Sequence, residues 1–444
     1  MVANYHVTML NHNRKVGAIM KDTLLHTPEG VRDIYNTECA VKLLLEKNLH
    51  QVLTLHGFRD IQTPSFEFFD IFNQERGTVA SKDMYKLFDK EGRTMVLRPD
   101  ITPSIARCVA KYYKDEELPI RLCYIGNTYI NSTAYQGKLK EVTQLGAELV
   151  NDDSVDADAE MLAITIECLL QSGLKEFQLE IGNADFFRSL VKEAGFEDEE
   201  DIAKLKNLIE NKNMFGMEEI IMNKNMSKEL EDMFLKLPEL FGTLEILDYA
   251  KGVSKNPRTI KAIKRLENIY EIMKEYGFEK YISFDLGMLS KYDYYTGIIF
   301  KAYTYKTGEA IVTGGRYDNL VGQFGKNCPA IGLAIVIDNL MLALSRQELL
   351  PTIDSSDTLI VYTSKYRKEA IMLANYFRKD GNNVILQVSK DKMDIDGYQS
   401  YMNNMNIGGL IYIDNDRNLI VMDAATGKKQ TMDIKGFLNN NHEE

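Results

Sequence analysis

Apolar residues recur at helical spacing in the first patterned part of the chain. Between Asn36 and Leu55 they occupy positions 41, 44, 45, 49 and 52, and Gly57 follows. This spacing places them on one face of a helix, and a glycine commonly follows a helix end. Residues 58–70 have a strand-like composition and contain Pro64. Because proline cannot donate to a sheet ladder, we expect an edge or interface strand there.

The strand-forming runs that follow are separated by helical stretches. Two of them, Met84–Asp89 and Thr94–Leu97, are joined by a short polar link, which predicts a hairpin. Residues from about 186 to 280 are instead rich in lysine and glutamate, and we predict a helical insertion there within a β-rich domain over residues 20–350. Around the insertion, the pattern predicts helices at 101–112 and 155–173 and strands at 121–131, 141–150, 177–182, 281–286, 294–305 and 309–313.

After Leu350 the pattern becomes a compact alternation of strands and helices. Such alternation predicts a small α/β domain with a largely parallel sheet, here over residues 357–440. At the other end, residues 1–19 precede Met20, and we expect them to be a poorly ordered N-terminal extension or the result of an early start codon. The C-terminal pattern consists of strands at 358–362, 383–388 and 409–413 and helices at 366–380 and 398–405.

Composition narrows the class of protein and of partner. The 444 residues are 45% hydrophobic and 27% charged, as in ordinary globular proteins. The net charge of −12 works against binding to a polyanion, which weakens the expectation of an RNA partner. The cysteines form no CxxC pair and the histidines show no metal-ligand spacing. We therefore expect no metal, no signal peptide or membrane span, and a reducing, cytoplasmic location.

Candidate chemistry is concentrated in four segments. These are Thr27–Ile34; Leu97–Thr102; Gly126–Tyr129 with Glu141–Glu148; and Asp293–Gly297 with Gly314–Leu320 and Pro329–Gly332. In this order, over about residues 24–345, they resemble the class II aminoacyl-tRNA synthetases, and specifically the histidyl branch. The resemblance implies an α+β fold with a class II synthetase-like antiparallel sheet, flanking helices and the helical insertion. The small C-terminal α/β domain then stands in the position of the family's anticodon-binding domain.

The resemblance also assigns a histidine-binding role to residues whose chemistry suits it. Asp100 and Thr102 would meet the α-ammonium of the ligand, because a carboxylate and a hydroxyl suit its three N–H donors. Gln144 and Glu148 are four residues apart on a predicted strand, so they face the same side. Gly146 between them leaves room above the sheet, and Glu148 would accept a hydrogen bond from the imidazole.

Aromatic and basic residues complete the implied site. Tyr294 or Tyr295 would cover the imidazole ring, while Arg316 and Tyr317, after a Gly-Gly turn, would close the pocket. Each residue alone is more often structural, since a strand glutamate commonly faces solvent and a tyrosine pair commonly packs in a core. Within the ordered segments they predict one histidine site, formed by Asp100, Thr102, Gln144, Glu148, Tyr294, Tyr295 and Arg316.

The chain departs from the synthetases at the positions that hold ATP. The family pattern has arginines where this chain has Ile130, Ser290 and Asn339, and an adenine-facing glutamate where it has Ser132. None of these side chains can replace a planar guanidinium that binds phosphate bidentately. Because losing one preorganised donor typically costs about 10²–10³ in rate, we expect no adenylation and no catalytic residue.

A histidine site without a nucleotide site resembles the regulatory subunits of ATP phosphoribosyltransferase, a family of histidyl-tRNA synthetase paralogues. This resemblance implies a non-catalytic chain that acts with a short catalytic subunit in the first step of histidine biosynthesis. It also implies feedback inhibition by bound histidine, a homodimer, and neither tRNA nor a cofactor. Two alternatives stay open: an active histidyl-tRNA synthetase, and a histidine sensor for a different enzyme.

Overall fold

The described residues of the computed structural model form two compact units. One unit contains Lys42–Leu350 with the described residues before Ile34, and the other contains Ile34–Val41 and the chain from Pro351. In the part of the chain that the structure describes, no helix is long and apolar enough to cross a membrane. The described residues are 25–72, 79–131, 138–222, 224, 226–254, 256–289, 294–353, 357–389, 395–413 and 418–433.

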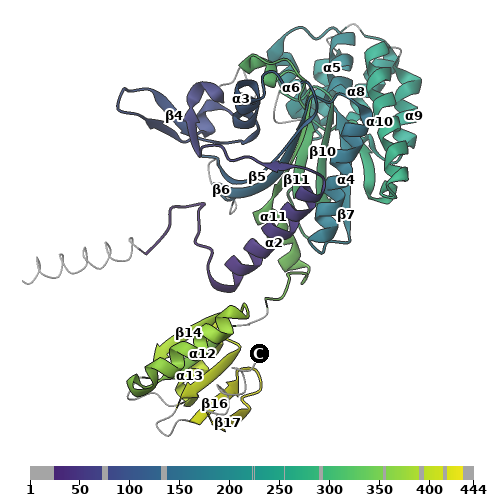
Figure 1. Ribbon diagram of the computed structural model, residues 1–444. Coiled ribbons are helices and arrows are strands. Elements are labelled where there is room, and N and C mark those ends of the chain that lie inside the picture. Colours follow the sequence, from purple (N-terminus) through teal and green to yellow (C-terminus); the bar gives the residue numbers. More distant parts are fainter. Residues whose placement is uncertain are drawn as a thin grey trace, which may run out of the picture. The chain divides into compact units, whose positions relative to one another are not determined.

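A nine-stranded sheet forms the centre of the first unit (Figure 1). Its order is β1-β5-β6-β12-β11-β10-β7-β9-β8. Pairing is antiparallel from β5 through to β7, which confirms the predicted antiparallel sheet, whereas β1 pairs parallel with β5 and β7 pairs parallel with β9. The strands are β1 (Arg59–Asp60), β5 (Ile120–Tyr129), β6 (Glu141–Val150), β7 (Phe177–Asn183), β8 (Phe241–Gly242), β9 (Ile282–Asp285), β10 (Ile298–Thr304), β11 (Val312–Arg316) and β12 (Ala330–Val336).

Helices pack on this sheet, and the most buried of them is α4 (Val155–Gln171). Its first turn is capped by Ser154, whose Oγ accepts a hydrogen bond from the backbone N–H of Ala157 at 3.0 Å. It contacts β12 on one side and α10 on another, which explains why most of its residues are buried. Helix α3 (Thr102–Tyr112) begins on the opposite side of the sheet, where Thr102 bonds Glu148, and α2 (Asn36–Leu55) and α11 (Ile337–Arg346) also lie outside the insertion.

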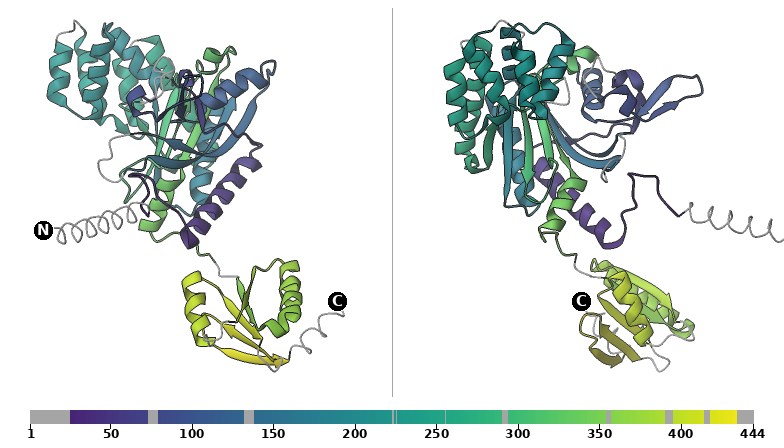
Figure 2. Two further views of the ribbon diagram at one scale, coloured as in Figure 1. Left: turned by 90° about the vertical axis from the view of Figure 1, so that its left-hand side faces the viewer. Right: turned by 180° about the vertical axis from the view of Figure 1, so that it is seen from behind.

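The predicted helical insertion is a group of helices beside the β7–β9–β8 end of the sheet (Figures 1 and 2). Its last helix, α10, begins at Pro257, where proline suits a first turn, and contacts α4, α5, α9 and β7. The short strand β8 lies within the insertion and joins the main sheet through β9. The helices are α5 (Ala184–Glu193), α6 (Glu199–Glu210), α7 (Met214–Met222), α8 (Lys228–Lys236), α9 (Glu245–Val253) and α10 (Pro257–Glu275).

A separate three-stranded sheet has the order β2-β4-β3 and contains the predicted hairpin. Its strands are β2 (Phe66–Phe68), β3 (Lys86–Phe88) and β4 (Thr94–Leu97), all antiparallel. Pro64 lies between β1 and β2, outside both ladders, in keeping with its missing N–H. Phe66, Phe68 and Phe88 are exposed by 55%, 46% and 72%, so this small sheet presents aromatic side chains to solvent.

The second unit has a five-stranded sheet in the order β14-β13-β15-β16-β17. The predicted α/β part is present: β13 (Thr358–Tyr362) pairs parallel with both β14 (Val384–Val388) and β15 (Gly409–Ile413), and the helices are α12 (Arg367–Lys379) and α13 (Ile395–Met405). The sequence did not predict the antiparallel strands β16 (Asn418–Asp423) and β17 (Lys429–Asp433). Every residue of β17 is exposed, so it has no hydrophobic pattern to find.

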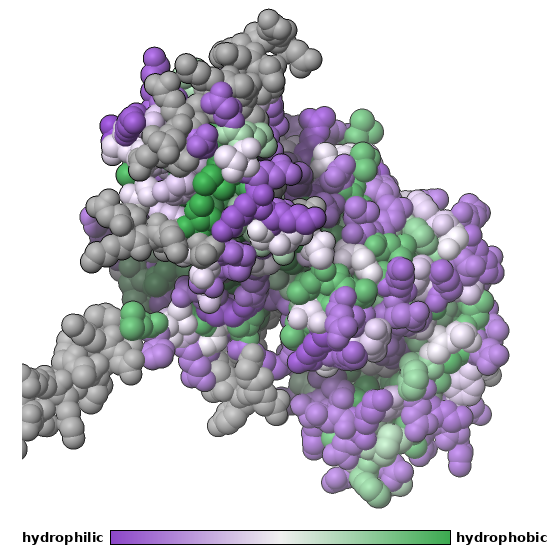
Figure 3. All heavy atoms as spheres, turned by 90° about the horizontal axis from the view of Figure 1, so that it is seen from below, coloured by the Kyte–Doolittle hydropathy of each residue, from purple (hydrophilic) through white to green (hydrophobic). Residues whose placement is uncertain are grey.

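Three local predictions are wrong. The strand predicted at 309–313 begins only at Val312 and continues to Arg316. The strand predicted at 294–305 begins only at Ile298, so Tyr294 and Tyr295 precede it. Gly314 and Gly315 do not form a turn but lie inside β11, paired with β10 and β12. A Cβ on Gly314 would lie 2.2 Å from the ring of Phe300, so these glycines permit close packing within the sheet. On the outside, the face drawn in Figure 3 is largely hydrophilic, with smaller hydrophobic groups between the polar ones.

Candidate functional site

A small pocket lies over the middle of the main sheet, where the sequence predicts the histidine site. Its floor comes from β6, β12 and β11, and its walls come from the start of α3 and the segment before β10. It encloses about 340 Å³ of empty space, including its open mouth. Six of the seven predicted residues line it: Asp100, Thr102, Gln144, Glu148, Tyr294 and Tyr295.

Glycines in three neighbouring strands make room for this pocket. A Cβ on Gly332 would lie 1.8 Å from Oε2 of Glu148, and one on Gly146 would lie 2.4 Å from the hydroxyl of Tyr124. On β11, a Cβ on Gly315 would lie 2.8 Å from the ring of Tyr295. Side chains from adjacent strands can therefore approach the sheet surface only because these positions lack a Cβ.

Glu148 is the central acid of the pocket and is 1% exposed. Its Oε1 accepts a hydrogen bond from the hydroxyl of Thr102 at 2.8 Å, and its Oε2 accepts one from the hydroxyl of Tyr317 at 2.5 Å. Burial raises the pKa of Glu148 to about 8, although both hydroxyls favour the ionised form and lower it. The carboxyl is thus held in a fixed orientation, and a ligand that donates to it would favour its ionisation.

Asp100 is the second buried acid, 6% exposed. Its Oδ2 accepts from the hydroxyl of Tyr294 at 2.9 Å, and its Oδ1 accepts from the backbone N–H of Thr102 at 3.3 Å. Burial raises the pKa of Asp100, opposed by these hydrogen bonds. Two buried acids in one pocket are poorly stabilised unless a cationic or N–H-rich ligand joins them.

The remaining predicted side chains supply an acceptor and an aromatic wall. Gln144 has a buried Oε1 with no hydrogen-bond partner in the described part of the chain, which is unusual for a buried polar atom. The rings of Tyr294 and Tyr295 lie 4.8 Å apart between centroids and tilt at 49°. Both rings line the pocket together with the two acids.

The structure places Arg316 outside the pocket. Its guanidinium bonds Asp158 on α4, with Nε to Oδ1 at 2.8 Å and Nη2 to Oδ1 at 2.6 Å. Asp158 is fully buried and also accepts from Nε of Arg265 on α10 at 2.6 Å. Because side chains alternate along a strand, Arg316 and Tyr317 face opposite sides, and it is Tyr317 that reaches the pocket. We therefore leave Arg316 out of the proposed histidine site.

Two positions of missing arginines, Ile130 and Asn339, lie outside the pocket lining. Ile130 donates its backbone N–H to the carbonyl oxygen of Lys140 at 2.9 Å, and Asn339 donates its amide to the carbonyl oxygen of Ala310 at 2.9 Å. Ser132 and Ser290 lie outside the residues that the structure describes. Among the described residues lining the pocket there is neither arginine nor lysine, so this lining offers nothing to neutralise a triphosphate.

Further lining residues were not among the seven predicted ones. They are Thr313, Tyr317, Gly332, Leu333 and Ala334. Tyr317 and Gly332 lie in segments that carry the resemblance, so those segments were the available signal. Thr313, Leu333 and Ala334 carry no such signal, because their place follows from the register of β11 and β12.

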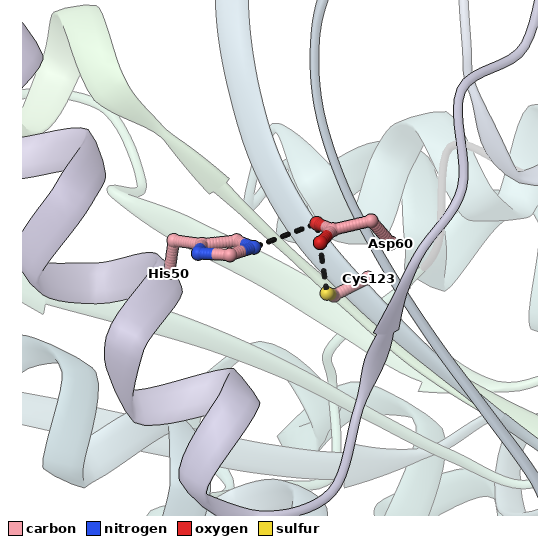
Figure 4. Close-up of side chains that lie close together, drawn as sticks. All are labelled: His50, Asp60 and Cys123. Carbon is pink, nitrogen blue, oxygen red and sulfur yellow. Dashed lines mark hydrogen bonds and ion pairs between the residues drawn. The ribbon is translucent and has the colours of Figure 1, made fainter.

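One cluster of metal-ligand residue types lies apart from this pocket (Figure 4). Nε2 of His50 lies 2.6 Å from Oδ1 of Asp60, and Sγ of Cys123 lies 3.7 Å from the same oxygen. Burial, with a smaller contribution from the Asp60 carboxylate, raises the pKa of Cys123 to about 12. The thiol is therefore protonated at neutral pH, and the three groups form a hydrogen-bonded chain. We assign no metal to them, and the absence of a metal stays a prediction.

Comparisons with known proteins agree on one family. The model of the histidyl-tRNA synthetase family matches residues 30–340. The ATP phosphoribosyltransferase regulatory subunit of Acetivibrio thermocellus is 37% identical over 419 residues, which cover 94% of this chain and 100% of the relative. The protein of the same name from Ruminiclostridium cellulolyticum is 38% identical over 416 residues, covering 94% of this chain and 99% of the relative.

Solved structures give the same result. A Bacillus halodurans protein described as an ATP phosphoribosyltransferase regulatory subunit/histidyl-tRNA synthetase superposes with a TM-score of 0.77 at 32% identity, over 87% of this chain and 98% of that one. Histidyl-tRNA synthetase from Nostoc sp. PCC 7120 has a TM-score of 0.75 at 20% identity, over 95% and 99%, which shows the shared fold alone. The predicted fold and regulatory, non-catalytic function are confirmed by these relatives. The chain belongs to the family of ATP phosphoribosyltransferase regulatory subunits, which share the fold of histidyl-tRNA synthetase.

Proposed function

We propose that the pocket binds free histidine, and that bound histidine inhibits an ATP phosphoribosyltransferase catalytic subunit with which this chain assembles. The observation that carries the proposal is the pair of buried acids, Asp100 and Glu148, in a pocket without a basic residue among its described lining. Histidine supplies an ammonium group and an imidazole N–H, which are the donors that two carboxylates can accept.

The geometry suggests how the ligand lies. The α-ammonium meets Asp100, Thr102 and the unpaired Oε1 of Gln144, which together can accept its three N–H donors. The imidazole then donates to Glu148, whose oxygens each keep a second lone pair beside the hydrogen bonds from Thr102 and Tyr317. Tyr295 and Tyr294 cover the ring.

The regulatory effect follows from linkage between histidine binding and the state of the complex. Histidine inhibits only if it binds the inactive state of the complex more tightly than the active one, and the difference in affinity sets the size of the effect. The names of the relatives support the catalytic subunit of ATP phosphoribosyltransferase as the partner whose activity expresses this difference in affinity.

A second copy of the chain is the proposed occupant of the exposed three-stranded sheet. Phe66, Phe68 and Phe88 present aromatic surface there, and the segment with Pro64 is the expected pairing region. Phe66→Glu together with Phe68→Glu should convert the dimer to a monomer, measured by light scattering at micromolar concentration. A wild-type chain that is monomeric, with and without the catalytic subunit, would contradict this part of the proposal.

The central experiment is reconstitution with a short-form catalytic subunit. Phosphoribosyl transfer is measured with and without this chain, and then with increasing histidine, while titration calorimetry follows histidine binding to the complex. We expect activation by the chain and inhibition by histidine, and Asp100→Asn should shift inhibition to higher histidine. Asp156→Asn, an exposed change on α4, is the control and should change neither. Inhibition that is unchanged in Asp100→Asn would place the regulatory site elsewhere.

A further inference from the structure

A second pocket lies at the β1 side of the main sheet and is not part of the histidine site. It encloses about 600 Å³ of empty space, including its open mouth. Residues 61–65, which follow β1, form one wall, and β5 and Arg98 form the others. Tyr124 and Ile101 stand between this pocket and the acidic one, but no acidic residue is among its described lining residues.

Arg98 is the only charged side chain in the described lining of this pocket, and it is 6% exposed. Its Nε donates to the carbonyl oxygen of Asn127 at 2.8 Å, and its Nη1 donates to the carbonyl oxygen of Thr63 at 2.9 Å. These bonds orient the guanidinium but leave its charge without a counter-charge. No carboxylate of the described residues lies within 4.0 Å of it, and the nearby Glu67 is paired with Arg107 at 2.6 Å. Buried charges in proteins are normally paired.

Three donors of the pocket make no hydrogen bond with the described residues. Nη2 of Arg98 makes no hydrogen bond with the described residues, and it lies over Gly126, where a Cβ would be 2.3 Å away. The side chains of Gln62 and Ser65, which flank Pro64 in the expected pairing region, are exposed in the single chain and likewise make none with its described part. Because Nε and Nη1 already donate to backbone carbonyl oxygens, Arg98 cannot form a bidentate pair of hydrogen bonds with a planar carboxylate. Donors that come from different directions suit a tetrahedral anion instead.

We infer that this pocket is a binding site for a phosphate group carried by a small molecule, held by Arg98 Nη2, Ser65 and Gln62. The site is independent of the histidine pocket, since it shares no polar group with it. A single buried guanidinium with two neutral donors predicts modest affinity, with a dissociation constant on the order of 1 mM or lower.

The experiment uses the full chain, with ribose 5-phosphate and inorganic phosphate as probes and ribose as the phosphate-free control. Calorimetry should show saturable binding of both phosphates and none of ribose. Arg98→Gln would also remove the bonds to Thr63 and Asn127, so Gln62→Glu is the primary variant. It places a carboxylate in the pocket at an exposed position and should weaken phosphate binding by at least about tenfold. The matched control is Gln51→Glu, the same change at an exposed position on α2, which should leave binding unchanged.

Three results would overturn the inference. The first is no saturation by either phosphate below about 10 mM, well above the expected constant. The second is phosphate binding that Gln62→Glu leaves unchanged, which would locate it elsewhere. The third is a dimer that is weakened by Gln62→Glu and dissociated by phosphate. In that case the group that fills the pocket would be an acidic side chain of a second copy. None of these readouts depends on histidine, so the proposed histidine site can fail or succeed separately.

Discussion

Replacing Glu148 by glutamine tests the proposed histidine site most directly. The change is nearly isosteric and keeps partners for Thr102 and Tyr317, whose hydroxyls can accept as well as donate. It removes a charged acceptor for the imidazole N–H, a hydrogen bond worth about 1.5–3 kcal/mol. Histidine affinity should therefore fall on the order of ten- to a hundredfold. Glu141→Gln, the same change at the other end of β6 and outside the pocket lining, should leave affinity unchanged.

The raised pKa of Glu148 adds a pH signature to the same experiment. With a pKa of about 8, the carboxyl of the empty pocket is mostly protonated at pH 7. If a neutral imidazole donates to the ionised form, binding at pH 7 should release about 0.9 proton, and affinity should rise about eightfold from pH 7 to pH 8.5. Calorimetry in buffers of different ionisation enthalpy measures the released proton. Glu148→Gln should abolish both effects.

As pH rises, the stability of the folded chain should fall, whereas its affinity for histidine should rise. Glu148 has a higher pKa in the folded chain than its ordinary 4.5, so the folded state holds the proton more tightly. Its contribution to stability is therefore full below about pH 4.5 and is lost as pH rises towards 8, by about 1.4 kcal/mol per pH unit. Glu148→Gln should remove this loss and unfold at a higher temperature than the wild type at pH 8–9. Unchanged histidine affinity, together with an unchanged pH profile of unfolding, would refute the assigned role of Glu148.

Three further outcomes are expected. Gly332→Ala should weaken histidine binding by at least about tenfold, because its Cβ would lie 1.8 Å from Oε2 of Glu148. Gly308→Ala, with nothing within 4 Å, should not, and calorimetry compares the two. Asp158→Ala should cost about 3 kcal/mol or more in urea unfolding, because it removes the main counter-charge of buried Arg316, and an unfolding midpoint like that of the wild type would contradict the pairing. The chain alone should not exchange pyrophosphate into ATP with histidine, and exchange at about 1 per second, ordinary for an enzyme, would overturn its non-catalytic assignment.

The sequence predicted the strongly patterned parts of the fold and six of the residues that line the pocket. The helix at Asn36–Leu55 and the strand at Glu141–Val150 have the predicted bounds, because their apolar residues repeat with a clear period. Gln144 and Glu148 face the pocket together because they are an even number of residues apart on that strand.

Where local pattern and tertiary packing differ, the sequence prediction failed. Two adjacent glycines predict a turn, yet Gly314 and Gly315 are in a strand because the rings of Phe300 and Tyr295 occupy the space beside them. Arg316 looked like a pocket residue because it follows those glycines. Only its ion pair with Asp158, 158 residues earlier in the chain, shows which side of the sheet Arg316 occupies. Such distant pairings leave no periodic trace in the sequence.

The end of β11 has a mechanical consequence, because two neighbouring residues there are fixed to different parts of the protein. Tyr317 bonds Glu148 inside the pocket, while Arg316 bonds Asp158, which is also held by Arg265 of the insertion helix α10. A single planar peptide bond joins the two residues, so a shift of the backbone at Tyr317 would also shift the backbone at Arg316. A ligand that moves the backbone at Tyr317 would therefore act on the salt bridges that join Arg316, Asp158 and Arg265. Through these bonds, helix α10 of the insertion is connected to the wall of the pocket.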